Sequence, residues 1–324
     1  MHRHLIAAAI TLFFLGMMAL LVKNEILPTL NTGDGIPVST RQLADEWTGK
    51  DEWARLSVNG RPVGALRTVA QRDGTGYHAF LKLILEGGPV SGKIETAALL
   101  NERLEIEQLH ATVTMPGAET PALELAGLVE HQTLRLRLSS ATGVKYQQVD
   151  LPRPITMNFA ADPFMSGNQM VPGETYAMDV YDPIWGMQTG RMKLTLAGTQ
   201  RATLNGVPFD ARIVEAEMGT ATTKIWLDQR GDPFRREIRV PLGGSSAPRN
   251  EKSAEAPQIV VRLDRIDSPE EMVKHAELRN LPDPPAFQPD DLRGEDSGEP
   301  LQALGILPML VKGSFGNLAG QNKQ

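Results

Sequence analysis

Histidine, serine and glycine are the residues here whose types could support catalysis or phosphate binding, and their spacing predicts neither. The six histidines are scattered, and no pair has the helical i,i+4 spacing with an intervening glutamate that a zinc hydrolase needs. No G-x-S-x-G sequence, which would expose a serine nucleophile on a sharp turn, occurs. Gly243-Gly244 lies in a Ser/Pro-rich loop instead of between a strand and a helix, so no phosphate loop is predicted. His78 and His110 could approach each other across strands, and we expect them to be half-exposed strand residues.

Cysteine is absent, which excludes disulfides, thiolate nucleophiles and cysteine-based zinc sites. Paired carboxylates are a further catalytic candidate, since glycosidases use two of them about 5–10 Å apart. With 39 Asp and Glu residues, some pair falls in this range by chance, so no particular pair is predicted to be a site. Arg230-Gly231-Asp232 has the sequence of an adhesion tripeptide, but its position between two strand patterns favours a turn. The sequence therefore predicts no catalytic residue, no metal ligand and no cofactor.

Adaptable apolar side chains give the more informative pattern. Several of the 13 methionines gather in the second half of the chain, and thioethers suit an irregular apolar cavity. Ordinary core packing is the alternative interpretation. The segments 161–170 and 181–187 could form loops over an open end of a sheet. The candidate residues of an apolar ligand cavity are Trp185, Met178, Met187, Met192 and Trp226.

Short strands are the elements that must position these residues. From Trp47 onward, apolar and polar residues alternate over short segments that turn residues separate. In the clearest segment, 133–138 (TLRLRL), the leucines share one face. Helical patterns between the strands are missing, so the fold class is all-β, a curved antiparallel sheet or partly open barrel of roughly ten to thirteen strands. The sequence leaves open whether the domain at 47–280 is one continuous sheet or two similar halves, about 47–150 and 151–280. The predicted strands are 52–58, 61–70, 77–86, 93–100, 104–115, 133–138, 174–181, 191–197, 210–218, 221–228, 233–240 and 258–264.

One short helix is predicted near the C-terminus. Residues 268–271 (SPEE) supply an N-cap serine, a proline at the first helical position and a capping-box glutamate, and Lys274 adds an i,i+4 ion pair. Residues 281–300 carry five prolines and six acidic residues against one arginine, so the tail 281–324 is predicted to be largely disordered. Within this tail, the apolar segment 301–311 is too short to span a bilayer and is expected to pack on the domain or on a partner.

The N-terminus carries the strongest local signal. Residues 5–22 (LIAAAITLFFLGMMALLV) are uncharged and lie between Arg3 and Lys23. As a helix they extend about 27 Å, close to the hydrocarbon thickness of a bilayer. The run is longer than the apolar part of most signal peptides and ends without a small-x-small cleavage site. The sequence therefore favours a transmembrane signal anchor at 1–23, with a cleaved signal peptide as the alternative. It also predicts a linker at 24–46 and places the rest of the chain on the periplasmic side of the inner membrane.

Three segments resemble a known kind of bacterial domain. Residues 52–64 (EWARLSVNGRPVG) look like the start of the β domains that precede transglutaminase-like modules in membrane-associated proteins. Residues 178–183 (MDVYDP) and 224–237 resemble two later segments of the same domains. Those domains are similar to the lipoprotein-carrier (LolA/LppX-like) fold, so the resemblance implies a strongly curved sheet around an apolar groove. No transglutaminase module follows and its cysteine is absent, so no catalytic residue is carried over.

These patterns together suggest a non-enzymatic protein. The net charge is −6 and no Lys/Arg-rich run occurs, which argues against nucleic-acid binding. The leading hypothesis is a membrane-tethered periplasmic domain that binds an apolar, lipid-like ligand or a partner protein at the cell envelope. One alternative is a structural subunit of an envelope membrane complex. The other is a carboxylate-dependent envelope hydrolase, which requires two inward-facing acids in a polar cleft.

Overall fold

The computed structural model describes residues 35–294, apart from 46, 48, 87–90, 142, 152, 168, 183–185, 205, 219–220 and 242–257. The predicted signal anchor at 1–23 and the apolar segment 301–311 lie outside the described residues. Over the part of the chain that is described, no helix has the length and apolar character needed to cross a membrane.

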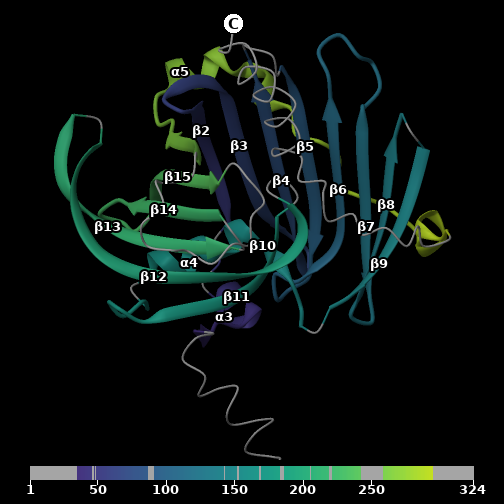
Figure 1. Ribbon diagram of the computed structural model, residues 1–324, viewed down its shortest axis with the longest axis horizontal. Helices are drawn as coiled ribbons and strands as arrows, with labels where there is room; N and C mark the ends of the chain where they lie inside the picture. The colour runs from purple at the N-terminus through teal and green to yellow at the C-terminus, as the bar shows by residue number, and fades with distance from the viewer. Residues whose placement is uncertain are drawn as a thin grey trace, which may run out of the picture.

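In the part of the chain that the structure describes, sixteen strands form one continuous, strongly curved sheet (Figure 1). Its order is β1-β11-β12-β13-β14-β15-β16-β2-β3-β4-β5-β6-β7-β8-β9, and β10 pairs with β11. Apart from the two-residue strands β1 and β10, which run parallel to β11, neighbouring strands are antiparallel. The strands are β1 (Ile36–Pro37), β2 (Lys50–Val58), β3 (Arg61–Asp73), β4 (Gly76–Leu85), β5 (Gly92–Leu100), β6 (Ile106–Thr114), β7 (Leu123–Glu130), β8 (Thr133–Ser140), β9 (Gly143–Asp150), β10 (Thr156–Met157), β11 (Thr175–Asp182), β12 (Gly186–Leu204), β13 (Val207–Met218), β14 (Ala221–Leu227), β15 (Pro233–Pro241) and β16 (Gln258–Arg265). The predicted β architecture is confirmed, and β7 and β9 are strands that the sequence patterns did not predict.

Two meanders make up this sheet, one from β2 to β9 and one from β11 to β16. The antiparallel pairing of β16 with β2 joins them, with Leu263 opposite Leu56. Asn59, in the turn after β2, strengthens this seam. Its side-chain oxygen accepts a hydrogen bond from the Val260 N–H at 3.0 Å, and its own N–H donates to the Val260 carbonyl at 2.8 Å. Because of this seam, both meanders share one concave face.

The main core lies on the concave face. In β8, for example, Leu134, Leu136 and Leu138 are buried, and the residues between them are partly exposed, as the period of two along a strand requires. The side chains of both meanders meet in one apolar cluster there. The curved sheet around an apolar interior, which the resemblance implied, is therefore confirmed.

A short helix precedes the first long strand. Helix α3 (Thr40–Asp45) buries Leu43 in the main core, and β1 ahead of it pairs with β11. The sequence placed a linker at 24–46, but residues 35–45 are part of the folded body.

Two further helical turns connect the meanders. The 3₁₀ helix η2 (Asn158–Ala161) and the helix α4 (Asp162–Ser166) bury Phe159 and Phe164 in the main core. The sequence predicted a loop at 161–170 and only one helix after the anchor. The apolar side chains of this segment instead fold it inward as a plug, and we refer to residues 158–166 as the lid.

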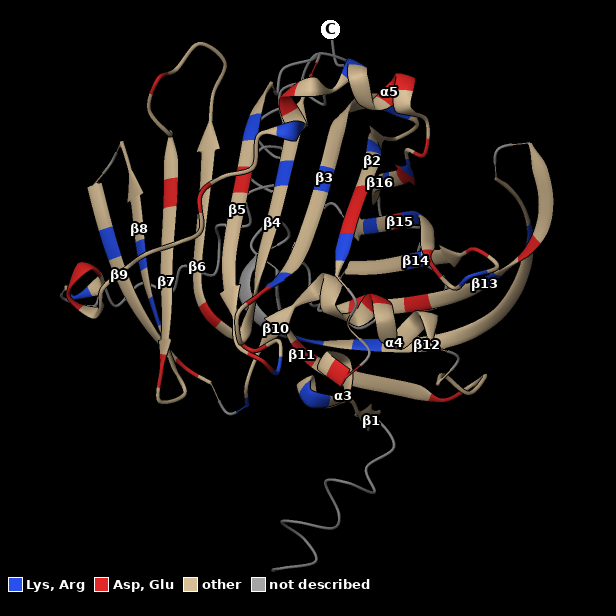
Figure 2. Ribbon diagram, turned by 180° about the vertical axis from the view of Figure 1, so that it is seen from behind, with Lys and Arg blue, Asp and Glu red and all other residues tan. Residues whose placement is uncertain are grey.

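The C-terminal part crosses the convex face of the sheet. Helix α5 (Pro269–Lys274) begins after Ser268 with a proline in its first turn, as predicted, although the Ser268 side chain makes no capping hydrogen bond. The chain then runs through η3 (Ala276–Arg279) and η4 (Pro289–Leu292) over strands of the first meander (Figure 2). We call residues 276–294 the strap.

Apolar and polar contacts hold the strap on the sheet. Leu278 is fully buried against the convex side of β2, β3 and β4. The Lys82 ammonium donates to the Asn280 carbonyl at 2.8 Å, and the Phe287 N–H donates to the Gln108 side chain at 3.0 Å. Residues 281–294, predicted to be largely disordered, are thus packed on the sheet, because widely spaced apolar side chains anchor the proline-rich segment.

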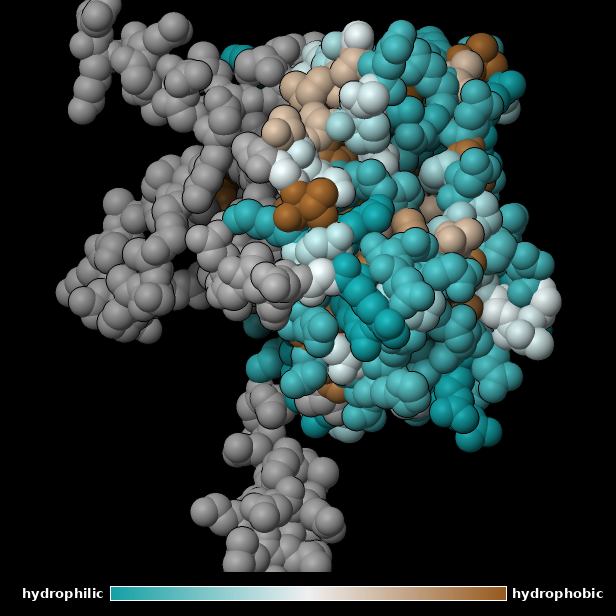
Figure 3. Space-filling model, turned by 90° about the vertical axis from the view of Figure 1, so that its right-hand side faces the viewer, coloured by the Kyte–Doolittle hydropathy of each residue, from teal (hydrophilic) through white to brown (hydrophobic). Residues whose placement is uncertain are grey.

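The edge of the sheet formed by β9 is polar. Most side chains of β9 are exposed or half-exposed. The described part of the surface on that side of the molecule is mainly hydrophilic, with scattered apolar residues (Figure 3). The β9 edge therefore adds little to the apolar surface of the domain.

Candidate functional site

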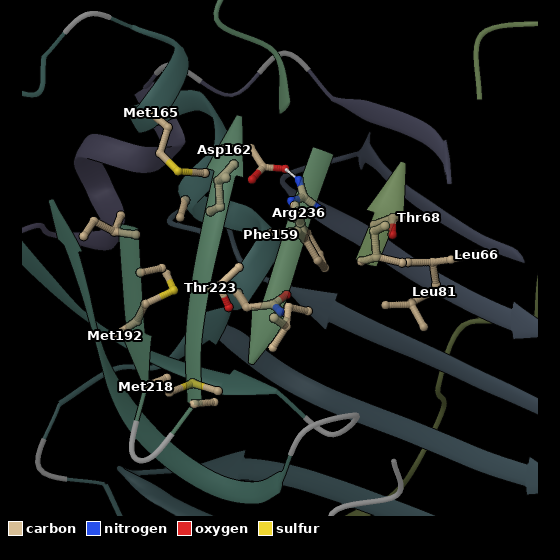
Figure 4. A pocket seen from close by; sticks show the side chains of 18 of the residues that line it. Leu66, Thr68, Leu81, Phe159, Asp162, Met165, Met192, Met218, Thr223 and Arg236 are labelled. Atoms are coloured by element: carbon tan, nitrogen blue, oxygen red, sulfur yellow. Dashed lines mark hydrogen bonds and ion pairs between the residues drawn. The ribbon is translucent and has the colours of Figure 1, made fainter. Parts of the chain in front are cut away.

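An apolar cavity lies between the two meanders, beneath the lid. Its volume is about 120 Å³. One wall comes from β2, β3 and β4, the facing wall from β12 to β16, and the lid closes it (Figure 4). The lining residues are Leu56, Leu66, Thr68, Leu81, Leu83, Asn158, Phe159, Ala161, Asp162, Met165, Met192, Leu194, Ala216, Met218, Ala221, Thr223, Ile225, Arg236, Ile238 and Leu263.

The size and lining define what this space can hold. An engineered apolar cavity of about 150 Å³ in another protein core binds a benzene-sized molecule. The cavity here is of that order, so with the lid in this position its volume corresponds to a small apolar group. Met165, Met192 and Met218 project into it from the lid, β12 and β13 (Figure 4). Flexible thioethers suit an irregular apolar space of this kind.

Of the five predicted cavity residues, the structure places Met192 in the lining. Met178 lies opposite Met192 in the β11–β12 register and is buried in the main core, outside the lining. Trp226 does not line the cavity. Ile225 faces the interior, so its neighbour Trp226 faces the other side of β14. Trp185 and the Met187 side chain lie outside the described residues.

A cluster of four charged side chains closes one end of the cavity. Lys50 and Glu52 come from β2, Arg236 from β15 and Asp162 from the lid. Arg236 donates to Asp162 at 2.8 Å and lies 3.4 Å from the Glu52 carboxylate. Lys50 lies 2.5 Å from Glu52 and also donates to Asp162. We call these four residues the charge cluster; their side chains are between 10 and 16% exposed.

The charge cluster is electrostatically balanced, with two cations and two anions. Burial alone would raise the pKa of Glu52, but the charges of Arg236 and Lys50 outweigh it and lower this pKa from 4.5 to about 2. Burial alone would lower the pKa of Arg236, and the carboxylates of Asp162 and Glu52 raise it instead. Glu52 and Arg236 are therefore ionised at neutral pH.

None of the four was singled out from the sequence, although one signal was available. In β2, Lys50 and Glu52 have the same parity as the buried Leu56, and in β15 Arg236 has the parity of the buried Ile238. Charged residues at positions that face a core indicate a buried ionic site. The contribution of the lid could not be read in this way, because the lid has no strand period.

The turn between β14 and β15 supports the lid. The Ser166 hydroxyl lies 2.9 Å from the Gly231 carbonyl, to which it donates. Gly231 has φ +88°, and a Cβ there would lie 2.8 Å from the Ser166 backbone. The Asp228 carboxylate accepts from the N–H groups of Arg230 and Asp232 and so fixes the turn. This confirms the interpretation of residues 230–232 as a turn.

A polar cleft of about 780 Å³ lies on the other side of the charge cluster. Lys50, Glu52 and Asp162 border this cleft, and Asp162 and Arg236 border the apolar cavity. The charge cluster thus lies between the apolar cavity and the polar cleft.

Glu52 and Asp162 are two inward-facing acids, the feature that the hydrolase alternative requires. A general acid needs a raised pKa, whereas that of Glu52 is lowered. Among the described residues, no three His, Asp or Glu side chains gather as a metal site. His78 and His110 are on β4 and β6, which β5 separates. What this arrangement can do is hold charge beside an apolar space.

Comparisons with known proteins give likenesses of structure alone. No protein-family model and no curated protein matches the chain. A β-barrel-like protein of the domain of unknown function DUF1849 from Brucella abortus is similar, with a TM-score of 0.44, 7% identity, and coverage of 67% of this chain and 95% of that one. The MucA/MucB complex of Pseudomonas aeruginosa gives a TM-score of 0.16 and 10% identity over 72% of this chain and 94% of that one. A second structure, MucB with MucA(peri), gives 0.15 and 10% over 75% and 95%.

Proposed function

We propose that this chain is a non-catalytic, membrane-tethered periplasmic protein whose curved sheet binds an apolar chain in the cavity between its meanders. The single observation that supports this most is the cavity, because three methionines and the leucines of both meanders face a space that they do not fill. The tether is the uncharged segment 5–22. We also propose that its β domain is of the kind that precedes transglutaminase-like modules in bacterial membrane-associated proteins.

The position of the cavity favours a ligand over a packing defect. Large voids are rare in well-packed cores, since each costs contact energy. This one lies at the seam between β16 and β2, where the two meanders meet, and its cover is a segment outside the sheet. A lid of two short helical turns can move without breaking strand pairing. An apolar chain could therefore enter and leave while the sheet stays intact.

Two adjacent threonines on β14 provide a matched test. Thr223 lines the cavity, whereas Thr222 is exposed. Apolar compounds are extracted from the purified full chain and identified by mass spectrometry. We expect Thr223→Phe to lose the extracted compound, because the ring fills the space that the compound occupies, and Thr222→Phe to retain it.

The outcome that contradicts the proposal is equal recovery from both variants, or no apolar compound from the unsubstituted chain. Circular dichroism of both variants shows whether the sheet is intact, so that a loss through unfolding is recognised.

A further inference from the structure

The binding of an apolar chain does not explain the charge cluster, because such a chain forms no ion pair or hydrogen bond with charged side chains. Two cations, Lys50 and Arg236, project from the rigid sheet toward the lid. Breaking a buried ion pair is costly, yet an intact pair is often no more stabilising than apolar side chains of the same volume. A latch that served only to hold the lid could be built from apolar contacts, so the buried cations call for another explanation.

The four side chains are not equivalent in how they are held. Arg236 is paired on both sides, with β14 and β16, and Lys50 and Glu52 are paired with β3, so strand pairing holds the backbone of all three residues. Asp162 is on the lid, which adds no strand to the sheet. If the lid moves, Asp162 leaves and the other three stay. Lys50 and Arg236 then contribute +2 and Glu52 −1, which leaves a net charge of +1 at the end of the cavity.

We propose that the ligand is a single-chain amphiphile with an anionic headgroup, and that this headgroup takes the place of the Asp162 carboxylate between Lys50 and Arg236. This inference rests on the proposed function and names its ligand class. The hydrocarbon chain lies among the methionines and leucines, and the headgroup lies where the cavity meets the polar cleft. Asp162 is then the internal substitute for the headgroup, and its release moves the lid and enlarges a space that is otherwise about 120 Å³.

Neighbouring charges fit this assignment. Arg265, the next cation along this side, is held by Asp228 at 2.9 Å and Asp267 at 2.9 Å and is not available to the headgroup. The low pKa of Glu52 reflects the positive field of Lys50 and Arg236 at this position. An arginine can hold a carboxylate or a phosphate through two parallel hydrogen bonds, so either headgroup satisfies the site.

The test uses the purified full chain and a palmitic acid analogue that carries a photoreactive diazirine in its chain. Cross-linking is competed with palmitate, with 1-hexadecanol of the same chain length, and with inorganic phosphate. We expect palmitate to compete at about a tenth of the hexadecanol concentration or less, because only its headgroup forms charge-assisted hydrogen bonds. Phosphate alone should not compete, since it has no chain to bury.

Two substitutions separate a headgroup site from a structural latch. Asp162→Asn keeps the shape of the side chain and removes its charge, so the hexadecanol-to-palmitate ratio of half-maximal concentrations should rise about ten-fold further. Arg236→Met should bring this ratio close to one. Arg236→Lys retains the positive charge and should preserve most of the ratio, so it serves as the control for a change at this position that does not remove the charge. Circular dichroism checks each variant.

Each remaining outcome decides a different point. If hexadecanol competes as well as palmitate in the unsubstituted chain and in Asp162→Asn, the headgroup inference is refuted and the apolar cavity stands. If phosphate alone competes as well as palmitate, the cluster is a free-anion site and the amphiphile assignment is refuted. If the probe does not label the cavity residues at all, the proposed function and this inference fail together.

Discussion

Glu52 offers a quantitative test of the charge cluster through the pH dependence of stability. Its pKa is lowered from 4.5 to about 2 in the folded chain. A lowered folded-state pKa stabilises the fold above the unfolded-state pKa, and this stabilisation is lost as the pH falls through the folded-state value. A depression of this size corresponds to about 3 kcal/mol at pH 7, of which about 2 kcal/mol is lost by pH 3.

The substitution Glu52→Gln removes this ionisation and keeps the side-chain shape. We expect Glu52→Gln to be less stable at pH 7 by about 3 kcal/mol, because Lys50 and Arg236 then face one anion. Its free energy of unfolding should fall by about 2 kcal/mol less than that of the unsubstituted chain between pH 7 and pH 3. Urea denaturation at both pH values, followed by tryptophan fluorescence, measures the difference.

The matched control is Asp51→Asn, which makes the same change of charge on the other face of β2, where Asp51 pairs with Arg67 at 2.8 Å and is half-exposed. Because the Asp51 side chain is 51% exposed, solvent screens this pair, and we expect it to contribute about 1 kcal/mol or less although Arg67 is 15% exposed. If Glu52→Gln and the unsubstituted chain lose stability in parallel between the two pH values, Glu52 is not held ionised by Lys50 and Arg236. The electrostatic reasoning about the cluster would then be wrong.

Two further substitutions test the strap and the support of the lid by the same denaturation assay. Leu278→Ala should lower the free energy of unfolding by about 2–5 kcal/mol, since Leu278 is fully buried. The control Val273→Ala, at an exposed position, should change it by less than about 0.5 kcal/mol. Equal effects of the two substitutions would show that the strap is not docked on the sheet. Gly231→Ala should cost about 1–3 kcal/mol for its positive φ, and more for the contact with the Ser166 backbone. Gly74→Ala, with positive φ and open space around it, isolates the strain, and an equal cost at both glycines would show that the turn does not press on the lid.

Local periodicity predicted most of the strands, because a strand between a core and solvent leaves a period of two in the sequence. The leucines of β8 are a clear instance. Periodicity says nothing about which strands pair over long separations, and so the seam between β16 and β2, some two hundred positions apart, could not be predicted. The same limit explains the charge cluster, since positions 50, 52, 162 and 236 are brought together only by that seam and the lid.

Two predictions differ from the structure for other reasons. The strap is rich in proline and acidic residues, a composition typical of disorder. A few anchors such as Leu278 and Leu292 nevertheless bury enough apolar surface to hold it on a preformed sheet. Trp226 is predicted to line a cavity, but its parity on β14 turns it to the other face, where it packs in one cluster with Phe209 and Phe234.

Strand β2 connects the strap to the charge cluster. Lys50 and Glu52 belong to the charge cluster with Asp162 and Arg236, whereas Trp53 packs with Leu278 of the strap. The Ile266 N–H donates to the Trp53 carbonyl at 2.7 Å, and helix α5 lies between Ile266 and the strap. A slip of one residue in β2 would reverse both faces at once, removing Lys50 and Glu52 from the charge cluster and Trp53 from the strap. The strap therefore helps to fix the register of β2 from the convex face, as the pairing of β16 with β2 does from within the sheet. The proposed binding chemistry depends on this register.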